Sequence, residues 1–135
     1  MDIRVTLADP GSLKPIPDVS GLEFGKQTTD HMFQMEYDHD RGWYDARIIP
    51  YEALSLDPSA LVLHYNQQIF EGLKAFRQPD GSVSLFRPDQ LAKRFHRSAT
   101  RMAMPVLDDE MFLESIRQLV GVEDRWVPSE AGTSL

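Results

Sequence analysis

Residues 88–104, PDQLAKRFHRSATRMAM, decide the fold class because they predict an amphipathic helix after a series of strands. Pro88 suits the first helical position, where its missing backbone N–H costs nothing. From Leu91 to Met102, apolar side chains recur at the spacing of one helix face. The helix is expected to stop at Pro105, since proline cannot continue a helix without losing a hydrogen bond.

A second helix is predicted to follow directly. Asp108 is a favourable N-cap, and the acidic residues after it suit the positive end of the helix dipole. Gly121 is the predicted C-cap, because glycine readily adopts the left-handed conformation that ends many helices. The buried stripe of this helix is expected to comprise Phe112, Ile116, Leu119 and Val120.

Upstream of the helices, the sequence predicts a first antiparallel hairpin. Its strands are expected at His31–Tyr37 and Trp43–Tyr51, with a turn at residues 38–42. Residues 53–63 show no clear period, and Asp57-Pro58 interrupts them. A short helical turn is expected at Gln67–Glu71.

A second hairpin is predicted around the turn Gln78-Pro79-Asp80-Gly81. Proline presets the first central residue of such a turn and glycine accepts a positive φ. The flanking strands are Leu73–Arg77 and Val83–Phe86. The predicted fold is therefore α+β, with antiparallel strands and two packed helices. Residues 1–22, rich in Pro and Gly, are expected to form a flexible lead-in to a domain of residues 23–135.

Composition excludes several classes of function. The chain has 135 residues, the size of one domain, and it contains no cysteine, which excludes disulfides, thiol catalysis and cysteine-bound zinc. A net charge of −7 disfavours binding to nucleic acids or anionic membranes. No apolar run is long enough to span a membrane and no secretion signal is visible, so a cytoplasmic location is expected.

One basic block stands out in this acidic chain. Seven of its 14 Lys and Arg residues lie between positions 74 and 104. The block is either a solvated helix face or a site for a small anion. On a helical wheel Arg94 lies closest to the apolar stripe, with Arg97 and Arg101 further out. A guanidinium at such a boundary suits bidentate binding of phosphate or carboxylate.

The tract HYNQQIFEGLK, residues 64–74, mixes aromatic, amide and acidic side chains without a simple period. Tyr65 and Phe70 would supply flat walls to a pocket, and ordinary aromatic packing is the alternative. The four histidines show no metal-ligand spacing, and Asp38-His39-Asp40 lies in a predicted turn. No metal site is predicted.

Several motifs in order resemble one enzyme family. They include His64-Tyr65-x-Gln67-x-x-Phe70-Glu71-Gly72-Leu73-Lys74-Ala75-Phe76-Arg77, Phe86-Arg87-Pro88-Asp89, Ala92-Lys93-Arg94-Phe95-x-x-Ser98-Ala99-x-Arg101-Met102-Ala103-Met104-Pro105, Phe24-Gly25-Lys26-x-x-Thr29-Asp30-His31-Met32 and Trp126-Val127-Pro128. Together they resemble the N-terminal part of branched-chain amino acid aminotransferases. These are enzymes of fold type IV that use pyridoxal 5'-phosphate, and the resemblance implies that the chain is their small N-terminal domain.

The resemblance also implies roles for individual residues. Arg94 matches the arginine that binds the cofactor phosphate. Phe70 and Tyr65 match aromatic residues of the substrate pocket, and Tyr65 would serve the site of a neighbouring subunit in a homodimer. Gly72 would lie on the cofactor side of the pocket. Asn66 replaces the usual glycine of the family, and asparagine is among the residues that tolerate a left-handed backbone.

The implied activity moves an amino group between leucine, isoleucine or valine and 2-oxoglutarate. The family's cofactor-binding lysine belongs to a catalytic large domain absent from this chain, and no lysine of this chain lies in the family's lysine motif. We therefore expect no catalytic residue here and no activity of the 135 residues alone. The alternatives are a D-amino-acid transaminase or an aminodeoxychorismate lyase of the same fold, or a non-catalytic binding or assembly module.

Overall fold

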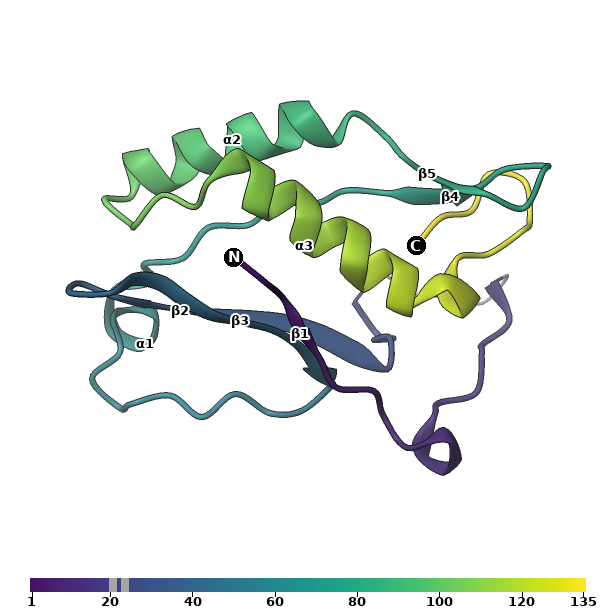
Figure 1. The fold of residues 1–135 in the computed structure, drawn as a ribbon, viewed down its shortest axis with the longest axis horizontal. Helices are drawn as coiled ribbons and strands as arrows, with labels where there is room; N and C mark the ends of the chain where they lie inside the picture. The colour runs from purple at the N-terminus through teal and green to yellow at the C-terminus, as the bar shows by residue number, and fades with distance from the viewer. Residues whose placement is uncertain (20–21, 23–24) are drawn as a thin grey trace.

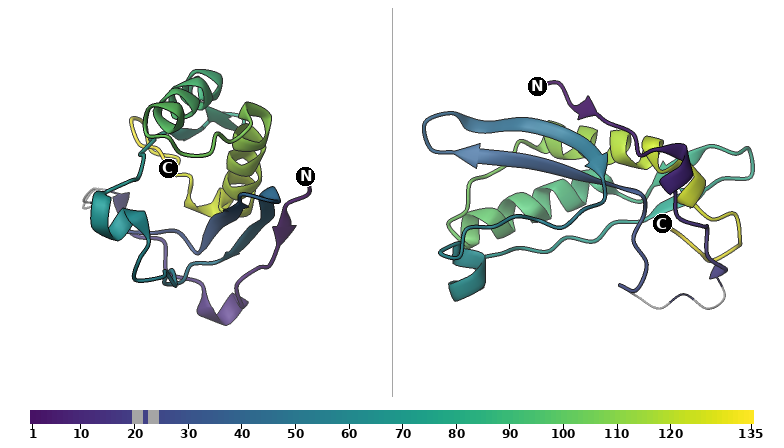
Figure 2. Two further views of the ribbon diagram at one scale, coloured as in Figure 1. Left: turned by 90° about the vertical axis from the view of Figure 1, so that its left-hand side faces the viewer. Right: turned by 90° about the horizontal axis from the view of Figure 1, so that it is seen from below.

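A computed structural model describes residues 1–19, 22 and 25–135 of the chain. Positions 20, 21, 23 and 24, which include Phe24 of the family motif and part of the predicted lead-in, lie outside the described residues. Two long helices cover one face of a three-stranded sheet, and a small hairpin lies at one end (Figures 1 and 2). The fold class is thus α+β, as the sequence predicts.

The first hairpin forms where the sequence predicts it. β2 (His31–Asp38) and β3 (Gly42–Pro50) pair antiparallel, from His31 opposite Pro50 to Asp38 opposite Gly42. The register shifts between Gln34 and Glu36, as at a β-bulge. Ile48 of β3 is completely buried.

The N-terminal segment departs from the prediction. β1 (Arg4–Val5) pairs in parallel with β3, so the sheet has the order β1-β3-β2 and is mixed rather than purely antiparallel. A short 3-10 turn, η1 (Pro10–Ser12), follows. Both residues of β1 are exposed, and the strand is only two residues long. It therefore lacks the alternation of apolar and polar residues by which a strand is predicted from sequence.

The second hairpin is confirmed, with slightly shorter strands. β4 (Ala75–Arg77) and β5 (Val83–Leu85) pair antiparallel. On the edge of β4 away from β5, Ala75 forms two backbone hydrogen bonds with Leu135, at N···O distances of 2.7 and 3.0 Å.

The helical turn predicted at residues 67–71 is wrong. The helix lies earlier, as α1 (Leu61–Tyr65), and ends at Asn66 in the left-handed conformation, with φ 50° and ψ 32°. An extended tract without regular structure then leads to β4. Asparagine thus adopts here the backbone conformation for which glycine is favoured.

Both long helices are confirmed. α2 spans Pro88–Arg101 and α3 spans Asp109–Val122. The carboxylate of Asp108 caps α3 by accepting from the backbone N–H groups of Glu110 and Met111. Phe95 and Phe112 pack between the two helices, with ring centroids 4.9 Å apart.

The predicted C-cap at Gly121 is wrong. The helix continues through Gly121 to Val122, and Glu123 is the C-cap residue, with its N–H bonded to the Leu119 carbonyl. A further 3-10 turn, η3 (Asp124–Trp126), extends the chain in the same direction. The helix is prolonged because Glu123 and Trp126 are buried against the start of β2.

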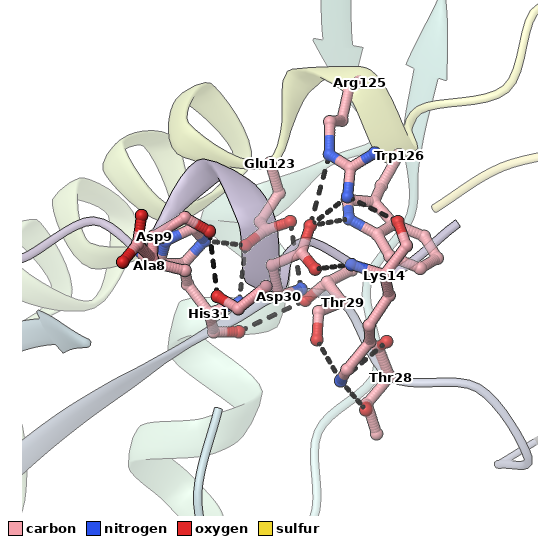
Figure 3. A network of polar contacts seen from close by, with 11 residues as sticks. Ala8, Asp9, Lys14, Thr28, Thr29, Asp30, His31, Glu123, Arg125 and Trp126 are labelled. Atoms are coloured by element: carbon pink, nitrogen blue, oxygen red, sulfur yellow. Dashed lines mark hydrogen bonds and ion pairs between the residues drawn. The ribbon is translucent and has the colours of Figure 1, made fainter. Parts of the chain in front are cut away.

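Figure 3 shows the polar network that joins the end of α3 to the start of β2. The Glu123 carboxylate accepts from the backbone N–H of His31 at 2.6 Å and from His31 Nδ1 at 2.5 Å. His31 Nε2 accepts the Ala8 backbone N–H at 2.8 Å, so the ring donates to Glu123 from Nδ1. One buried histidine therefore ties three distant parts of the chain together.

Asp30 is the second buried carboxylate of this network. It accepts from the Lys14 backbone N–H, Trp126 Nε1 and the guanidinium of Arg125. Burial by itself raises the pKa of Asp30, but these hydrogen bonds and the Arg125 charge outweigh it and lower the pKa from 3.8 to about 2. Asp30 is therefore ionised at every pH at which most proteins are folded.

Candidate functional site

Two of the residues singled out in the sequence, Phe70 and Arg94, line the same surface groove. The groove has a volume of about 380 Å³ and lies between α2 and the tract that precedes β4. Its walls are Ile69, Phe70, Arg94, Arg97, Ser98, Arg101 and Met102. The aromatic ring and three guanidinium groups thus meet at one place, although Phe70 and Arg94 are 24 positions apart in the sequence.

Glu71, the neighbour of Phe70, forms a two-point ion pair with Arg94. Nε of Arg94 donates to Oε2 of Glu71 at 2.7 Å, and Nη2 of Arg94 donates to Oε1. The Glu71 side chain is only 6% exposed, whereas that of Arg94 is 57% exposed. The pair therefore places a buried carboxylate behind a guanidinium that faces the solvent.

The same contact shifts the protonation of both partners. The hydrogen bond from Arg94 is the main influence on the pKa of Glu71 and, with help from the Gly72 backbone N–H, lowers this pKa despite burial. In return, Glu71 raises the pKa of Arg94. Glu71 is therefore a carboxylate and Arg94 a cation throughout the physiological pH range.

Part of the hydrogen-bonding capacity of Arg94 remains available. A guanidinium has five N–H groups, and Glu71 engages Nε and one hydrogen of Nη2. In the part of the chain that the structure describes, no contact uses Nη1 of Arg94, and Arg97 and Arg101 form no ion pair. The groove thus presents free donors and an excess of positive charge, which suits an anion such as a phosphate group.

Gly72 lies next to this arrangement. Its backbone N–H donates to Oε1 of Glu71 at 2.9 Å, and a β-carbon at this position would meet the Phe70 ring at 3.7 Å, an ordinary contact distance. Of these three consecutive residues, Glu71 contacts Arg94 directly, and Gly72 supports the Glu71 carboxylate.

Tyr65 is not part of the groove. Its exposed fraction is 78%, and it ends α1, from which the left-handed turn at Asn66 directs the chain away. Gln67 then attaches the tract to the end of α2 by donating from Nε2 to the Met102 carbonyl at 2.9 Å. Phe70 and Arg94 therefore line the groove together, Gly72 adjoins it only through its contact with Glu71, and Tyr65 lies outside it.

The residue that sequence reasoning missed is Glu71. It lies in a tract without a helical or strand period, and its partner Arg94 is 23 positions away. No spacing rule connects two such positions. The signal available was an acidic residue at the end of the tract predicted as a helical turn, residues 67–71, close in sequence to a block with an excess of basic residues.

A larger cavity than the groove lies elsewhere. It measures about 720 Å³ and is bounded by the N-terminal segment and by residues 125–135, among them Trp126 and Leu135. None of the residues predicted to bind cofactor or substrate lines it. We place the candidate site at Arg94 because that groove combines free cationic donors with an aromatic wall.

Two features are absent from residues 1–19, 22 and 25–135. No group of three or more His, Asp or Glu side chains there is arranged to hold a metal ion. No helix there is both long enough and apolar enough to cross a lipid bilayer.

Comparison with known proteins assigns the chain to a family, although no family model matches it. The chain is 57% identical over 122 residues to branched-chain-amino-acid transaminase 1 of Bacillus subtilis, a match covering 90% of the chain and 34% of the relative. It is 50% identical over 133 residues to branched-chain-amino-acid aminotransferase 2 of the same organism, with 98% and 36% covered.

A third relative comes from a different genus. The branched-chain-amino-acid aminotransferase of Mycolicibacterium smegmatis is 54% identical over 109 residues, which cover 81% of the chain and 30% of the relative. The chain therefore spans about a third of the length of these proteins. With half or more of the aligned residues identical over most of its length, this chain belongs to the family of branched-chain-amino-acid aminotransferases.

Proposed function

We propose that this chain is the small N-terminal domain of a pyridoxal-phosphate-dependent branched-chain aminotransferase of fold type IV, and that the groove at Arg94 binds the phosphate group of the cofactor. The observation that carries the proposal is the guanidinium of Arg94, which keeps unused donors in a groove shared with Phe70. The relatives, which are named as branched-chain enzymes, support the same assignment.

The residues of the groove fit a phosphate monoester. A dianion needs several N–H donors and a positive surrounding, which Arg94, Arg97 and Arg101 supply. Phe70 offers a flat apolar surface beside them. When bound, the cofactor would serve as the electron acceptor for the substrate amino acid. The residues of this chain would hold the phosphate of the cofactor and shape the pocket.

The substrates are proposed to be branched-chain amino acids and 2-oxo acids. An aliphatic side chain would lie against Phe70, which is 81% exposed in this chain and so has apolar surface to bury. Tyr65 is exposed and outside the groove, a position that fits its proposed role in the site of a second subunit of a homodimer. A cytoplasmic location stays part of the proposal.

The chain is proposed to lack the lysine that bonds the cofactor. Lysine residues occur only at positions 14, 26, 74 and 93, and none of them lines the groove. We therefore expect the 135 residues alone to give no glutamate from leucine and 2-oxoglutarate in the presence of pyridoxal 5'-phosphate. Sustained glutamate formation would contradict this part of the proposal.

The phosphate site is tested by comparing two ligands that differ only in the phosphate. Pyridoxamine 5'-phosphate and pyridoxamine are titrated into the ¹⁵N-labelled chain, and the Arg94 Nε–H signal is followed by NMR. We expect the phosphorylated ligand to bind at least about tenfold more tightly, the value of a charge-assisted hydrogen bond, and Arg94→Ala to remove that preference. Equal affinity for the two ligands would refute the proposal.

Of the alternatives, a D-amino-acid transaminase or an aminodeoxychorismate lyase would share the fold. The names of the relatives favour the branched-chain enzyme over both. A non-catalytic module would bind neither ligand in a phosphate-dependent way, so the same titration distinguishes it.

A further inference from the structure

We propose that Glu71 is a positioning residue: it fixes the Nε edge of Arg94 so that the opposite edge of the guanidinium is presented to a phosphate group. This inference rests on the proposed function of Arg94. It adds a residue whose own carboxylate would never contact the anion.

Glu71 engages Nε and Nη2 of Arg94 with its two oxygens, and this planar two-point contact defines the orientation of the guanidinium. The donors that remain are both hydrogens of Nη1 and the second hydrogen of Nη2. They point away from Glu71, because all five N–H groups lie in one plane around the central carbon.

The contact with Glu71 also restricts the motion of the Arg94 side chain. Fixing an arginine side chain costs rotamer entropy, so an exposed arginine is a poor anion site unless something else has already ordered it. Glu71 is able to do this because its side chain is 94% buried and its Oε1 also accepts the Gly72 N–H. The rigid partner orders the mobile one before the anion arrives.

The negative charge of Glu71 acts against phosphate binding. A carboxylate beside Arg94 repels an incoming phosphate and reduces the positive potential of the groove. Arg97 and Arg101 line the same groove without ion pairs to described residues, so the groove keeps a positive excess. Repulsion is screened in this open site, whereas the orientation of the donors is not. Positioning is therefore expected to prevail.

The sign of one measurement separates the two effects. If Glu71 mainly orders Arg94, Glu71→Ala weakens phosphate binding; if it mainly competes for Arg94, the same change strengthens binding. Inorganic phosphate is titrated into the 135-residue chain by NMR at constant ionic strength, and the exchange of the Arg94 Nε–H with water is measured in parallel.

We expect Glu71→Ala to raise the dissociation constant for phosphate about tenfold and to accelerate exchange of the Arg94 Nε–H. Glu71→Gln keeps the side-chain volume and one acceptor oxygen, and it should give an intermediate affinity. If Glu71→Ala fails to fold, Glu71→Gln is the deciding variant, and a smaller rise of the dissociation constant for phosphate is expected.

Glu114→Ala is the matched control. It removes the same charge and another Glu–Arg pair, in which Nη1 of Arg117 lies 3.3 Å from Glu114 on α3, outside the groove. It should leave both readouts unchanged. An unchanged or tighter phosphate affinity in the Glu71 variants, with Arg94→Ala abolishing binding, would overturn the positioning role alone. If Arg94→Ala also leaves the affinity unchanged, the phosphate site itself is wrong.

Discussion

Asp30 shows how a single buried carboxylate affects the whole domain. Its pKa is about 2 in the folded chain against an ordinary value of 3.8, so its contribution to stability is complete only well above pH 4. The contribution is lost as the pH falls through the folded value. The shift corresponds to about 2 kcal/mol of unfolding free energy.

We expect Asp30→Asn to lower the free energy of unfolding by about 2 kcal/mol at pH 7 and to flatten the loss of stability between about pH 4 and pH 2. Urea denaturation followed by circular dichroism at several pH values measures both. Asp40→Asn, in the exposed turn between β2 and β3, is the control. A pH dependence of Asp30→Asn identical to that of the unaltered chain would contradict this account.

The Glu71–Arg94 pair makes a prediction about titration. Because Arg94 lowers the pKa of Glu71, Arg94→Ala should raise that pKa, and burial should then carry it above its ordinary value. The side-chain carboxyl signal of Glu71 in a pH titration by ¹³C NMR gives the value directly. Arg97→Ala, from the same groove, should leave it nearly unchanged.

At the scale of single residues, the sequence predicted part of the candidate site at Arg94. Arg94 was identifiable because helical periodicity places it beside an apolar stripe, and Phe70 because an aromatic residue stood in a tract without a period. Glu71 and Asp30 were not identifiable, since their partners are 23 and 95 positions away and come close only in the folded chain.

Among the elements, α3 depends on its cap. Asp108 accepts from two backbone N–H groups that would otherwise lack partners within the helix. Asp108→Ala should cost about 1 kcal/mol of unfolding free energy, whereas Asp108→Asn should cost much less because it retains an acceptor oxygen. Thermal unfolding of the two variants tests this, and equal melting temperatures would exclude a capping role.

The elements also differ in how far they can be predicted. α2, α3 and both hairpins carry strong local signals, namely a helical period, a capping residue or a Pro–Gly turn, and all four form as expected. β1 and α1 are two and five residues long and contain no buried residue. β1 owes its conformation to its pairing with β3, which no local pattern encodes.

At the scale of the whole molecule, the tract between β3 and β4 exposes many large apolar side chains. Between β3 and β4, the large apolar side chains that are more than half exposed are Tyr51, Leu54, Leu56, Leu61, Leu63, Tyr65 and Phe70. Surfaces of this kind mark contacts with other proteins or other parts of a longer protein.

We therefore expect the 135-residue chain to self-associate. Sedimentation velocity should show oligomers whose fraction rises with concentration, and Leu63→Ser combined with Phe70→Ser should reduce it. Val5→Ser, which alters an exposed apolar residue of β1, is the matched control. A clean monomer at high concentration would contradict the expectation.

The paired backbone of Leu135 and Ala75 has a practical consequence for fusion proteins. Because the pairing is antiparallel, any residues joined after Leu135 would start alongside Lys74 and run back towards Gly72. A purification tag placed there would therefore begin along the tract that leads to the arginine-lined groove. An affinity tag belongs at Met1 instead, which lies beside Trp43 and Met111, away from that groove.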